Sequence, residues 1–535
     1  MSVSRRVFTT GLSAASLAAQ TTPTTTAFAH GVASGDPLVN RVIIWTRVSP
    51  TNLQDQVTVE WSVAEDAAFR RVLQRGVTST NIGFDFTVKV DVTRLDPNTT
   101  YYYRFAALGA QSPIGRTKTL PIGAVDRVRF AVASCSNFPY GFFNAYRMIA
   151  NRADLDCVLH LGDYIYEYGE GQYGTGAPIG RAPLPNKEIV TLDDYRQRYA
   201  QYRSDADLQE AHRQHPWIVV WDDHESANDA WTDGAQNHQP GTEGDWSTRR
   251  AVATQAWFEW LPVRENPFLN SQIYRTFRFG DLMDLSMLDT RLAGRSEQVG
   301  GRSQLAGTPQ PVTGPSQPVA PTSPLLADPN RSLLGSDQEA WLFQELLSSQ
   351  NRSTRWRVVG QQVMMGQLLN PADGNIFNPD QWDGYPVARN RFLNHLATNQ
   401  ISNVVVLTGD IHSSWGNEIT ANPFLPGGFT PRCVEFVTPA VTSPGIDDRA
   451  QATGFQLQIG ATHPHVKYVE LFRRGYMLID IDKDRAQAEF YHVATITERK
   501  AEEEFARALQ AANGVSRLTP ASQSRPRNNP APFAT

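Results

Sequence analysis

The sequence predicts an α/β layered domain that follows a smaller all-β sandwich. Residues 30 to about 122 contain runs of alternating hydrophobicity, such as VIIWTRV and TVKVDVT, separated by Pro, Asn, Asp and Gly, which is typical of strands. From about residue 127, short apolar strands such as RVRFAVASC alternate with helical stretches, and this favours stacked layers of sheet and helix. At 535 residues the chain is also too long for one ordinary core, so two or more domains are expected.

A tyrosine-rich segment makes the assignment of the smaller domain more specific. LDPNTTYYYRFAAL, residues 95–108, is a turn followed by alternating tyrosines. It resembles the late strand of an immunoglobulin or fibronectin sandwich, in which a corner tyrosine hydrogen-bonds back to the backbone. We therefore expect an immunoglobulin- or fibronectin-like β-sandwich over residues 30–122 and the larger α/β domain over residues 123–500.

Two helices and a loop are also predicted. GSDQEAWLFQELLSSQ carries a capping box, with Ser336 at the cap and Glu339 three residues later. Gly, Pro, Ser and Thr dominate residues 298–330, which indicates a surface loop or insertion. ERKAEEEFARALQAANG predicts a helix ended by Gly514, so residues 501–535 are expected to form a C-terminal helix and a polar tail.

The first 29 residues have the features of an export signal. Arg5-Arg6, with Phe8 two residues on, resembles a twin-arginine signal, and Ala27-Phe28-Ala29 is an A-x-A cleavage site. This predicts export by the twin-arginine route and a mature chain in the periplasm or secreted. The alternative is a disordered N-terminus with a chance pair of arginines.

Composition narrows the classes of partner. The net charge is -5, so no broad basic surface indicates a nucleic-acid partner. No later segment offers about 18 or more continuous apolar residues, so no transmembrane anchor is expected. Cysteines stand at positions 135, 157 and 433, which is too few for a disulfide framework.

Four predicted strands end in groups that can bind metal. The segments are SC at 134–135, GDYIY at 162–166, DDHE at 222–225 and GDIH at 409–412. In layered α/β folds, sites gather where strands end and loops begin. One such end is common by chance, but four that carry Cys, Asp, Tyr and His together predict a metal site.

This mixture of groups suits phosphoester hydrolysis. Two metals about 3.5–4 Å apart can activate a water, neutralise phosphoryl oxygens and stabilise the leaving group, with a carboxylate as the bridge. Asp163 is the expected bridge. The phenolate of Tyr166 and the thiolate of Cys135 would suit Fe(III) better than Ca(II) or Mg(II), which take oxygen ligands. A hard cation would then take its ligands from Asp163, Asp223 and Asn228.

The motifs resemble those of a known superfamily. Gly162-Asp163-x-x-Tyr166, Asp223-His224-Glu225 and Gly409-Asp410-x-His412 are similar to the calcineurin-like metallophosphoesterase signature. The chain departs from the common pattern of this superfamily at three positions. Asp stands in place of Asn before His224, Asp410 stands in place of the usual His, and Cys135 stands in place of the first Asp-x-His. These departures resemble the alkaline phosphatase D (PhoD) family. HGVASGDPLVNRVIIWTR, at the start of the sandwich, strengthens the resemblance, which covers roughly residues 30–500.

The resemblance implies two mixed sheets flanked by helices, Fe(III) and Ca(II) in the site, and an exported alkaline phosphatase or phosphodiesterase. Its substrates would be small phosphate mono- and diesters, attacked by a metal-bound hydroxide. A phospholipase D-like phosphodiesterase that acts on phospholipid is the alternative, and an inactive cell-surface binding protein is a further one. The ligands carried over by the resemblance are Cys135, Asp163, Tyr166, Asp223, Asp410 and His412.

Further residues are assigned with an alternative beside each. His224 is the candidate general acid or else a ligand or hydrogen-bonding partner of one. Asn228 is a candidate for a metal or for substrate. Arg291, after an apolar run, is expected to hold a phosphate bidentately or to form a structural pair with Asp289.

Some nearby side chains are expected to matter less. Glu167 and Glu170 fit solvated loop positions better than a calcium site. Gln361 and Gln362 stand where relatives supply a histidine ligand, and they are weaker ligands. Aromatic residues are dense in 138–146 and 164–173, which suits either core packing or an apolar wall for an alkyl or aryl ester.

Overall fold

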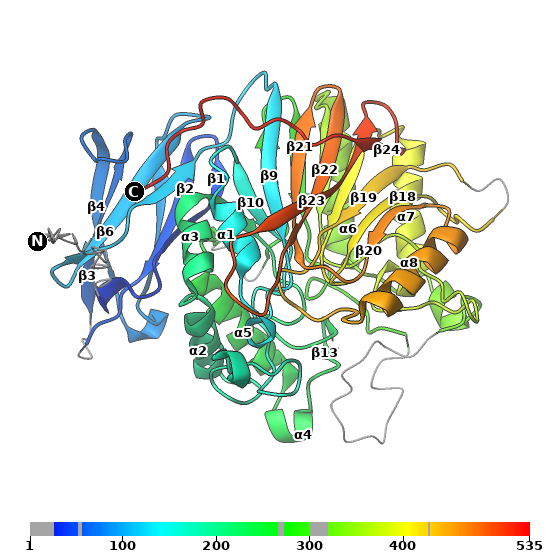
Figure 1. Cartoon of the computed structure of the whole chain (residues 1–535), viewed down its shortest axis with the longest axis horizontal. Coiled ribbons are helices and arrows are strands. Elements are labelled where there is room, and N and C mark those ends of the chain that lie inside the picture. Colours follow the sequence, from blue (N-terminus) through cyan, green and yellow to red (C-terminus); the bar gives the residue numbers. More distant parts are fainter. Residues whose placement is uncertain (1–25, 52–55, 266–271, 300–318, 426–428) are drawn as a thin grey trace, which may run out of the picture.

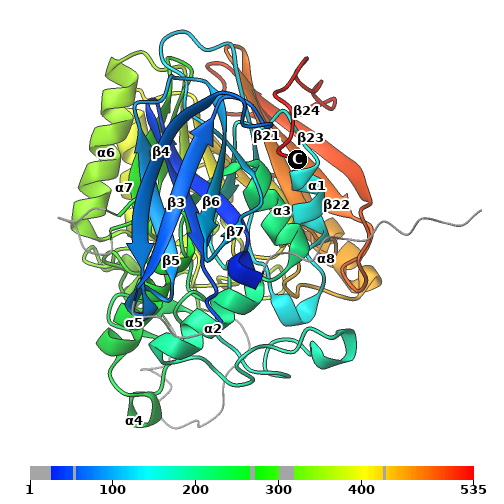
Figure 2. The ribbon, with the colours of Figure 1, turned by 90° about the vertical axis from the view of Figure 1, so that its left-hand side faces the viewer.

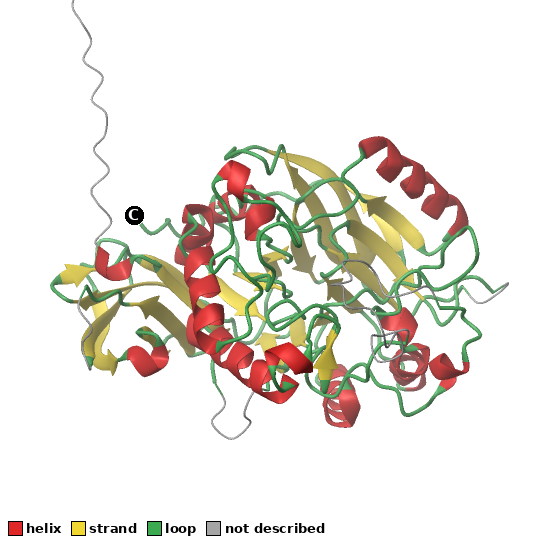
Figure 3. Ribbon diagram, turned by 90° about the horizontal axis from the view of Figure 1, so that it is seen from below, coloured by secondary structure: helices red, strands yellow, loops and turns green. Residues whose placement is uncertain are grey.

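Two large β-sheets pack face to face in the centre of the molecule, with a smaller N-terminal sheet beside them (Figure 1). The computed structural model describes residues 26–51, 56–265, 272–299, 319–425 and 429–535. Helices lie around the outside of the central strands (Figure 3). The predicted fold class, a layered α/β domain preceded by an all-β region, is confirmed.

The larger sheet is mixed and contains strands from both ends of the chain. In spatial order it is formed by β24 (Leu518–Ala521), β23 (Glu503–Ala512), β22 (Arg485–Val493), β21 (Gly475–Asp482), β9 (Arg127–Ala133), β10 (Cys157–His160), β11 (Pro216–Val219), β1 (Val32–Leu38), β2 (Arg41–Arg47) and β5 (Thr87–Thr93). The central neighbours β9, β10 and β11 run parallel, so their carboxyl ends meet at one edge.

The second sheet is also mixed. In spatial order it is formed by β14 (Arg275–Phe279), β15 (Met283–Met287), β16 (Trp356–Gly360), β17 (Val404–Thr408), β19 (Cys433–Val437), β18 (Ser414–Ile419) and β20 (Val466–Glu470). The N-terminal sheet contains β4 (Val72–Thr80), β3 (Val57–Ala64), β6 (Thr100–Ala107), β7 (Ala110–Gln111) and β8 (Gly115–Lys118). A short hairpin pairs β12 (Ala230–Trp231) with β13 (Gly234–Ala235).

The helices come mainly from connections between strands. They are α1 (Asn144–Ala150), α2 (Leu192–Tyr202), α3 (Ala206–Gln214), α4 (Pro240–Glu243), α5 (Trp246–Trp260), α6 (Gly335–Asn351), α7 (Pro386–Thr398) and α8 (Arg449–Thr462). Short 3₁₀ helices are η1 (Thr26–Phe28), η2 (Ile82–Phe84), η3 (Phe138–Tyr140), η4 (Ala177–Ile179), η6 (Pro324–Ala327) and η7 (Trp382–Gly384). The capping box predicted for α6 is wrong, because Ser336 lies inside its first turn and Glu339 forms an ion pair with Arg391 (2.8 Å).

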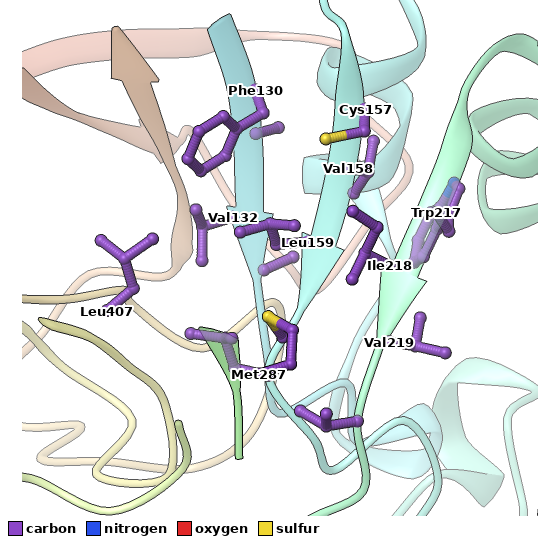
Figure 4. Packing of buried hydrophobic residues seen from close by; sticks show 14 of the residues in the cluster. Phe130, Val132, Cys157, Val158, Leu159, Trp217, Ile218, Val219, Met287 and Leu407 are labelled. Atoms are coloured by element: carbon purple, nitrogen blue, oxygen red, sulfur yellow. The ribbon is translucent and has the colours of Figure 1, made fainter. Parts of the chain in front are cut away.

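One continuous core joins the facing sheets. Figure 4 shows side chains of β9, β10 and β11 packed with Met287 and Leu407 from the second sheet. These strands are buried on both faces, as expected for strands covered on both sides. The core therefore fixes the two sheets relative to each other and holds their loop-bearing edges in place.

The N-terminal region has its own core but shares a sheet with the larger domain. Its sandwich pairs the small sheet, seen in front in Figure 2, with β1, β2 and β5. The backbone N–H of Asp96 donates to the hydroxyl of Tyr101 (2.8 Å), so the predicted corner tyrosine is confirmed. Ser34 in β1 pairs in parallel with Pro216 in β11, which extends the large sheet into the sandwich without a break.

The predicted C-terminal helix is wrong. Residues 503–512 form β23, which pairs antiparallel with β22 and β24. These pairings bury Ala508, Leu509 and Ala511, and the tertiary contacts outweigh the helix propensity of an Ala- and Glu-rich segment. Gly514 does end the element, at φ +79°.

The polar tail beyond β24, residues 522–535, returns across the molecule to the N-terminal sheet (Figure 1). We call it the C-terminal strap. The carbonyl of Pro532 accepts a hydrogen bond from Tyr102 (2.6 Å), and the carbonyl of Ala534 accepts one from Arg213 (3.0 Å). The strap therefore joins the outer end of the large sheet to the sandwich.

Some sequence predictions fall partly outside the described residues. The arginine pair of the export signal lies there, and so do residues 300–318 of the predicted loop. Phe28, in the predicted cleavage motif, is described and is buried in the sandwich core. Within the described parts of the chain, the helices are too short or too polar to cross a membrane.

Candidate metal centre and active site

The predicted site residues meet where strands of both sheets end. Cys135 follows β9, Asp163 follows β10, Asp223 follows β11, and Asp410 follows β17 of the second sheet. A parallel bridge between Ser134 and Ala440 joins the chain after β9 to the chain after β19 at this edge. Parallel strands place their carboxyl ends together, and this explains why segments far apart in sequence converge.

Metal-binding groups form three overlapping triads, each with ligand atoms within 4.8 Å of one another. The triads are Cys135, Asp163 and His412; Asp163, Asp223 and His224; and Asp222, Asp223 and Asp410. Asp163 links the first triad to the second, and Asp223 links the second to the third. The shared carboxylates suit two adjacent cations with bridging ligands.

The backbone at these positions is unusual. Four site residues, Cys135, Asp163, Asp410 and His412, have φ between +56° and +61°. This left-handed backbone conformation costs free energy in residues other than glycine, and residues that adopt it are concentrated at functional sites. Gly162 has φ +104°, and a Cβ there would lie 2.4 Å from the Cβ of Asp222. The turn after β10 therefore requires glycine.

Glu225 clamps two of the loops together. Its carboxylate accepts hydrogen bonds from the backbone N–H groups of Asp163 (3.1 Å), Tyr164 (2.6 Å) and Asp222 (2.8 Å). One side chain thus fixes the chain after β10 against the chain after β11. This role explains a glutamate beside His224 without making it a ligand.

The site holds more negative charge than its protein neighbours balance. We call Asp163, Asp222, Asp223 and Asp410 the carboxylate cluster. Burial and neighbouring carboxylates raise the pKa of Asp163 well above its usual value, and burial raises the pKa of Asp410 to about 6. Two buried oxygens, Oδ1 of Asp163 and Oδ2 of Asp222, have no hydrogen-bond partner. Both observations fit bound cations.

The donors around Cys135 are of a different type. Tyr166 donates a hydrogen bond to Asp163 (2.9 Å), accepts one from Ser443 (2.6 Å) and lies 3.2 Å from Nε2 of His412. The carbonyl oxygen of Pro444 accepts a hydrogen bond from Nδ1–H of His412 (2.6 Å), which leaves the lone pair of the ring on Nε2. Burial lowers the pKa of His412 to about 3, so its ring is neutral and able to bind metal. Sulfur, phenol and imidazole donors together suit a transition metal.

His224 is paired with a buried carboxylate. Its Nδ1 lies 2.6 Å from Glu167, and Glu167 also accepts hydrogen bonds from the backbone of Asn228 (2.7 Å) and the side chain of Asn237 (2.9 Å). Burial alone would lower the pKa of His224, but Glu167 and Asp223 reverse this and raise it well above the usual value. The solvated position expected for Glu167 is therefore wrong, because the 164–173 loop folds inward.

Arg291 forms ion pairs within the carboxylate cluster. Its guanidinium is fully buried and pairs with Asp222, with Asp380 (2.8 Å) and with Asp410 (2.8 Å). These ion pairs favour the structural alternative over phosphate binding, although the partner is not Asp289, which instead caps the turn at the backbone of Arg291 (2.9 Å). The guanidinium balances part of the negative charge that the four aspartates create.

The remaining candidates have other partners. The side chain of Asn228, which is half-buried, donates to Gln236 (3.1 Å). Gln361 bonds to Thr408 (2.8 Å), and Gln362 bonds to the backbone and hydroxyl of Thr290, so neither amide is a free ligand. Asp222, Glu167 and Ser443 were not selected from the sequence. Asp222 was detectable, since it stands beside Asp223 at the same strand end.

Comparisons with known proteins show the family to which this chain belongs. Residues 130–490 match the family model of PhoD-like phosphatases, and residues 13–121 match the model of their N-terminal domain. Alkaline phosphatase D of Bacillus subtilis (strain 168) is 37% identical over 486 residues, which cover 88% of this chain and 78% of that protein. A solved structure of PhoD has a TM-score of 0.83 and 35% identity, and covers 94% of this chain and 93% of that one. This chain therefore belongs to the PhoD-like phosphatase family.

Proposed function

We propose that this protein is an exported, metal-dependent phosphoric ester hydrolase that acts on phosphate mono- and diesters. The observation that carries the proposal is the set of three triads joined through Asp163 and Asp223. Membership of the PhoD-like phosphatase family supports the reaction class, and the name of the Bacillus subtilis relative supports alkaline phosphatase activity.

The donor set supports Fe(III) beside Ca(II). Cys135, Tyr166 and His412 would hold the iron, together with Asp163 as the shared ligand. Asp222, Asp223 and Asp410 supply the oxygen donors that calcium prefers. When bound, these metals would activate a water for direct attack on phosphorus and neutralise the phosphoryl oxygens.

The protein's own groups supply positioning and a proton. His224 of the second triad is assigned as an acid and not as a metal ligand, because its raised pKa keeps the ring protonated. Held by Glu167, it can donate a proton from Nε2 to the leaving oxygen of the ester. Glu225 and the strained turns fix the carboxylates before substrate arrives, which removes reorganisation from the reaction. Asn228 remains a proposed contact for a metal or for substrate.

The test is hydrolysis measured on three esters with the purified protein. We expect release of 4-nitrophenolate from 4-nitrophenyl phosphate and from the bis(4-nitrophenyl) diester, and its loss in Cys135→Ala. Phosphatidylcholine is the third substrate, and a rate there above both aryl esters would favour the phospholipase D-like alternative. No hydrolysis of any ester by metal-replete protein would overturn the proposal and favour a binding protein.

Export by the twin-arginine route remains a proposal as well. It rests on Arg5-Arg6 and on the A-x-A motif. The N-terminal residue of the protein recovered outside the cytoplasm tests it, with His30 as the expected start. Loss of export in an Arg5→Lys, Arg6→Lys variant is the second expected result, and export that persists would contradict the route.

A further inference from the structure

An apolar pocket of about 280 Å³ opens beside the metal centre. It lies between the loop 368–377, the start of β18 and helix α8. Its apolar walls include Leu368, Ile411, Trp415, Ile446, Phe455 and Ile459. His412 also lines this pocket, and the same residue belongs to the triad with Cys135 and Asp163.

The pocket is supported from below and open at one side. Leu368, Trp415 and Ile459 belong to a hydrophobic cluster between the second sheet and α8, so the floor of the pocket is buried and packed. Phe455 on α8 is 42% exposed and Phe377 on the loop is 47% exposed, which leaves apolar surface at the rim. A ligand can therefore enter from solvent and reach the side chain of His412.

The residues that line the pocket favour an uncharged, apolar ligand. Among the described residues that line this pocket there is no Asp, Glu, Lys or Arg, so these residues offer no carboxylate, ammonium or guanidinium group to balance an ionic ligand. The volume is about twice that of a cavity of about 150 Å³ known to bind benzene. Burying each methylene of an alkyl group in such a pocket favours binding by about fourfold.

We propose that this pocket holds the alkyl chain of a phosphodiester whose phosphorus lies at the metal centre. The inference rests on the proposed function and adds to it a substrate class, phosphodiesters with an apolar alkyl group. His412 is the boundary between the two parts of the site. The aromatic segments 138–146 and 164–173, which the sequence offered as an apolar wall, do not line this pocket.

The test is a series of 4-nitrophenyl alkyl phosphodiesters from methyl to octyl, each kept below its micelle concentration. Water replaces 4-nitrophenolate at phosphorus in every case, so the chemistry is constant while chain length varies. We expect kcat/KM to rise about three- to fourfold per methylene until the pocket is full. A flat profile from methyl to octyl, with the methyl ester cleaved, would overturn the pocket and leave the proposed function intact.

Helix α8 offers a matched pair of variants. Phe455 lines the pocket, whereas Leu457, two residues on and 72% exposed, does not. In Phe455→Asp the ratio of octyl to methyl kcat/KM should fall at least about tenfold, since a carboxylate replaces an apolar wall. Leu457→Asp should keep the ratio of the wild type.

A filling variant tests the pocket in the opposite way. Ala372 lies in the exposed loop that forms one wall, so Ala372→Trp should shorten the optimal chain without removing core contacts. Equal ratios in the Phe455, Leu457 and Ala372 variants would overturn the inference. If no ester in the series is cleaved, the proposed function fails, and this inference fails with it.

Discussion

Two groups of buried aspartates lie at opposite ends of β9 and β10 and have opposite surroundings. Asp154 and Asp156, before β10, and Asp480 in β21 form what we call the paired cluster. Asp156 alone accepts from Lys118 (2.6 Å), from Arg527 of the C-terminal strap (2.8 Å) and from the backbone of Arg129 (2.8 Å). In the carboxylate cluster, at the carboxyl ends, three of the four aspartates, Asp222, Asp223 and Asp410, share the single guanidinium of Arg291.

The pKa of Asp156 is shifted in the opposite direction from the pKa values of Asp163 and Asp222. Burial alone would raise the pKa of Asp156, but Lys118 and Arg527 reverse this, so its pKa is lowered. At Asp163 and Asp222 burial and neighbouring carboxylates outweigh the nearby positive charges, so the pKa of each is raised. Asp223 differs from its neighbours, because Arg291 and His224 outweigh burial there and lower its pKa to about 2. Buried charge that the protein balances serves stability, whereas buried charge left unbalanced indicates a ligand of opposite sign.

The largest expected effect comes from Asp163→Asn, which tests whether the carboxylate cluster acts through metal. The amide keeps the shape of the side chain but removes the charge shared by two triads. Hydrolysis of 4-nitrophenyl phosphate should fall at least about a thousandfold, together with bound metal. The free energy of unfolding of the chelated protein should not fall. Full activity with normal metal content would contradict the assignment of the carboxylate cluster as the metal site.

Asp156→Asn makes the corresponding change in the paired cluster. It leaves Lys118 and Arg527 without their carboxylate, and because their side chains are 20% and 24% exposed, water recovers part of the loss. We expect the free energy of unfolding to fall by about 2–3 kcal/mol, below the cost of breaking a fully buried pair. Chemical denaturation measures this. The kcat should stay at the wild-type value, and a large loss of kcat would show that the clusters are not separate.

Glu167→Gln sharpens the assignment of His224 within the active site. Without the negative charge of Glu167 the pKa of His224 should fall, so less of the ring is protonated. We expect kcat to fall about 10- to 100-fold for phenyl phosphate. Hydrolysis of 2,4-dinitrophenyl phosphate, whose leaving group needs no proton, is the control and should fall much less. Equal losses on both substrates would mean that Glu167 only supports the loop.

The smallest expected effect is a change in the free energy of unfolding at acid pH. Because the folded-state pKa of Asp156 is lowered, its contribution to stability is present above the unfolded pKa of about 3.9 and is lost as pH falls below it. The difference in unfolding free energy between wild type and Asp156→Asn should therefore shrink below about pH 4. A difference that stays constant from pH 7 to pH 3 would contradict ionic pairing at this end of the sheet.

The sequence predicted that the residues at four strand ends would lie close together. Cys135, Asp163, Asp223 and Asp410 each follow an apolar strand, and parallel packing brings such ends together whatever the loops do. Glu167 could not be assigned in this way. Its inward position depends on Asn237 and His224, which lie about sixty or seventy residues away in the sequence.

The fold was predicted where local pattern and tertiary role agree. Tyr101 is an example, since its hydrogen bond is made within its own turn. Residues 503–512 are the opposite case, because their conformation is set by pairing with β22 and β24 and not by their own propensity. The course of the C-terminal strap likewise depends on distant partners, Tyr102 and Asp156 among them.

The central claim is that the carboxylate cluster and its neighbours Cys135, Tyr166 and His412 form a metal centre that catalyses ester hydrolysis. Metal content and the visible absorption spectrum of the purified protein, recorded with activity before and after chelation, test it most directly. We expect iron and calcium, a visible charge-transfer band that Tyr166→Phe shifts or removes, and activity that disappears with the metals. Full hydrolytic activity in protein that contains neither metal and shows no such band would contradict the claim.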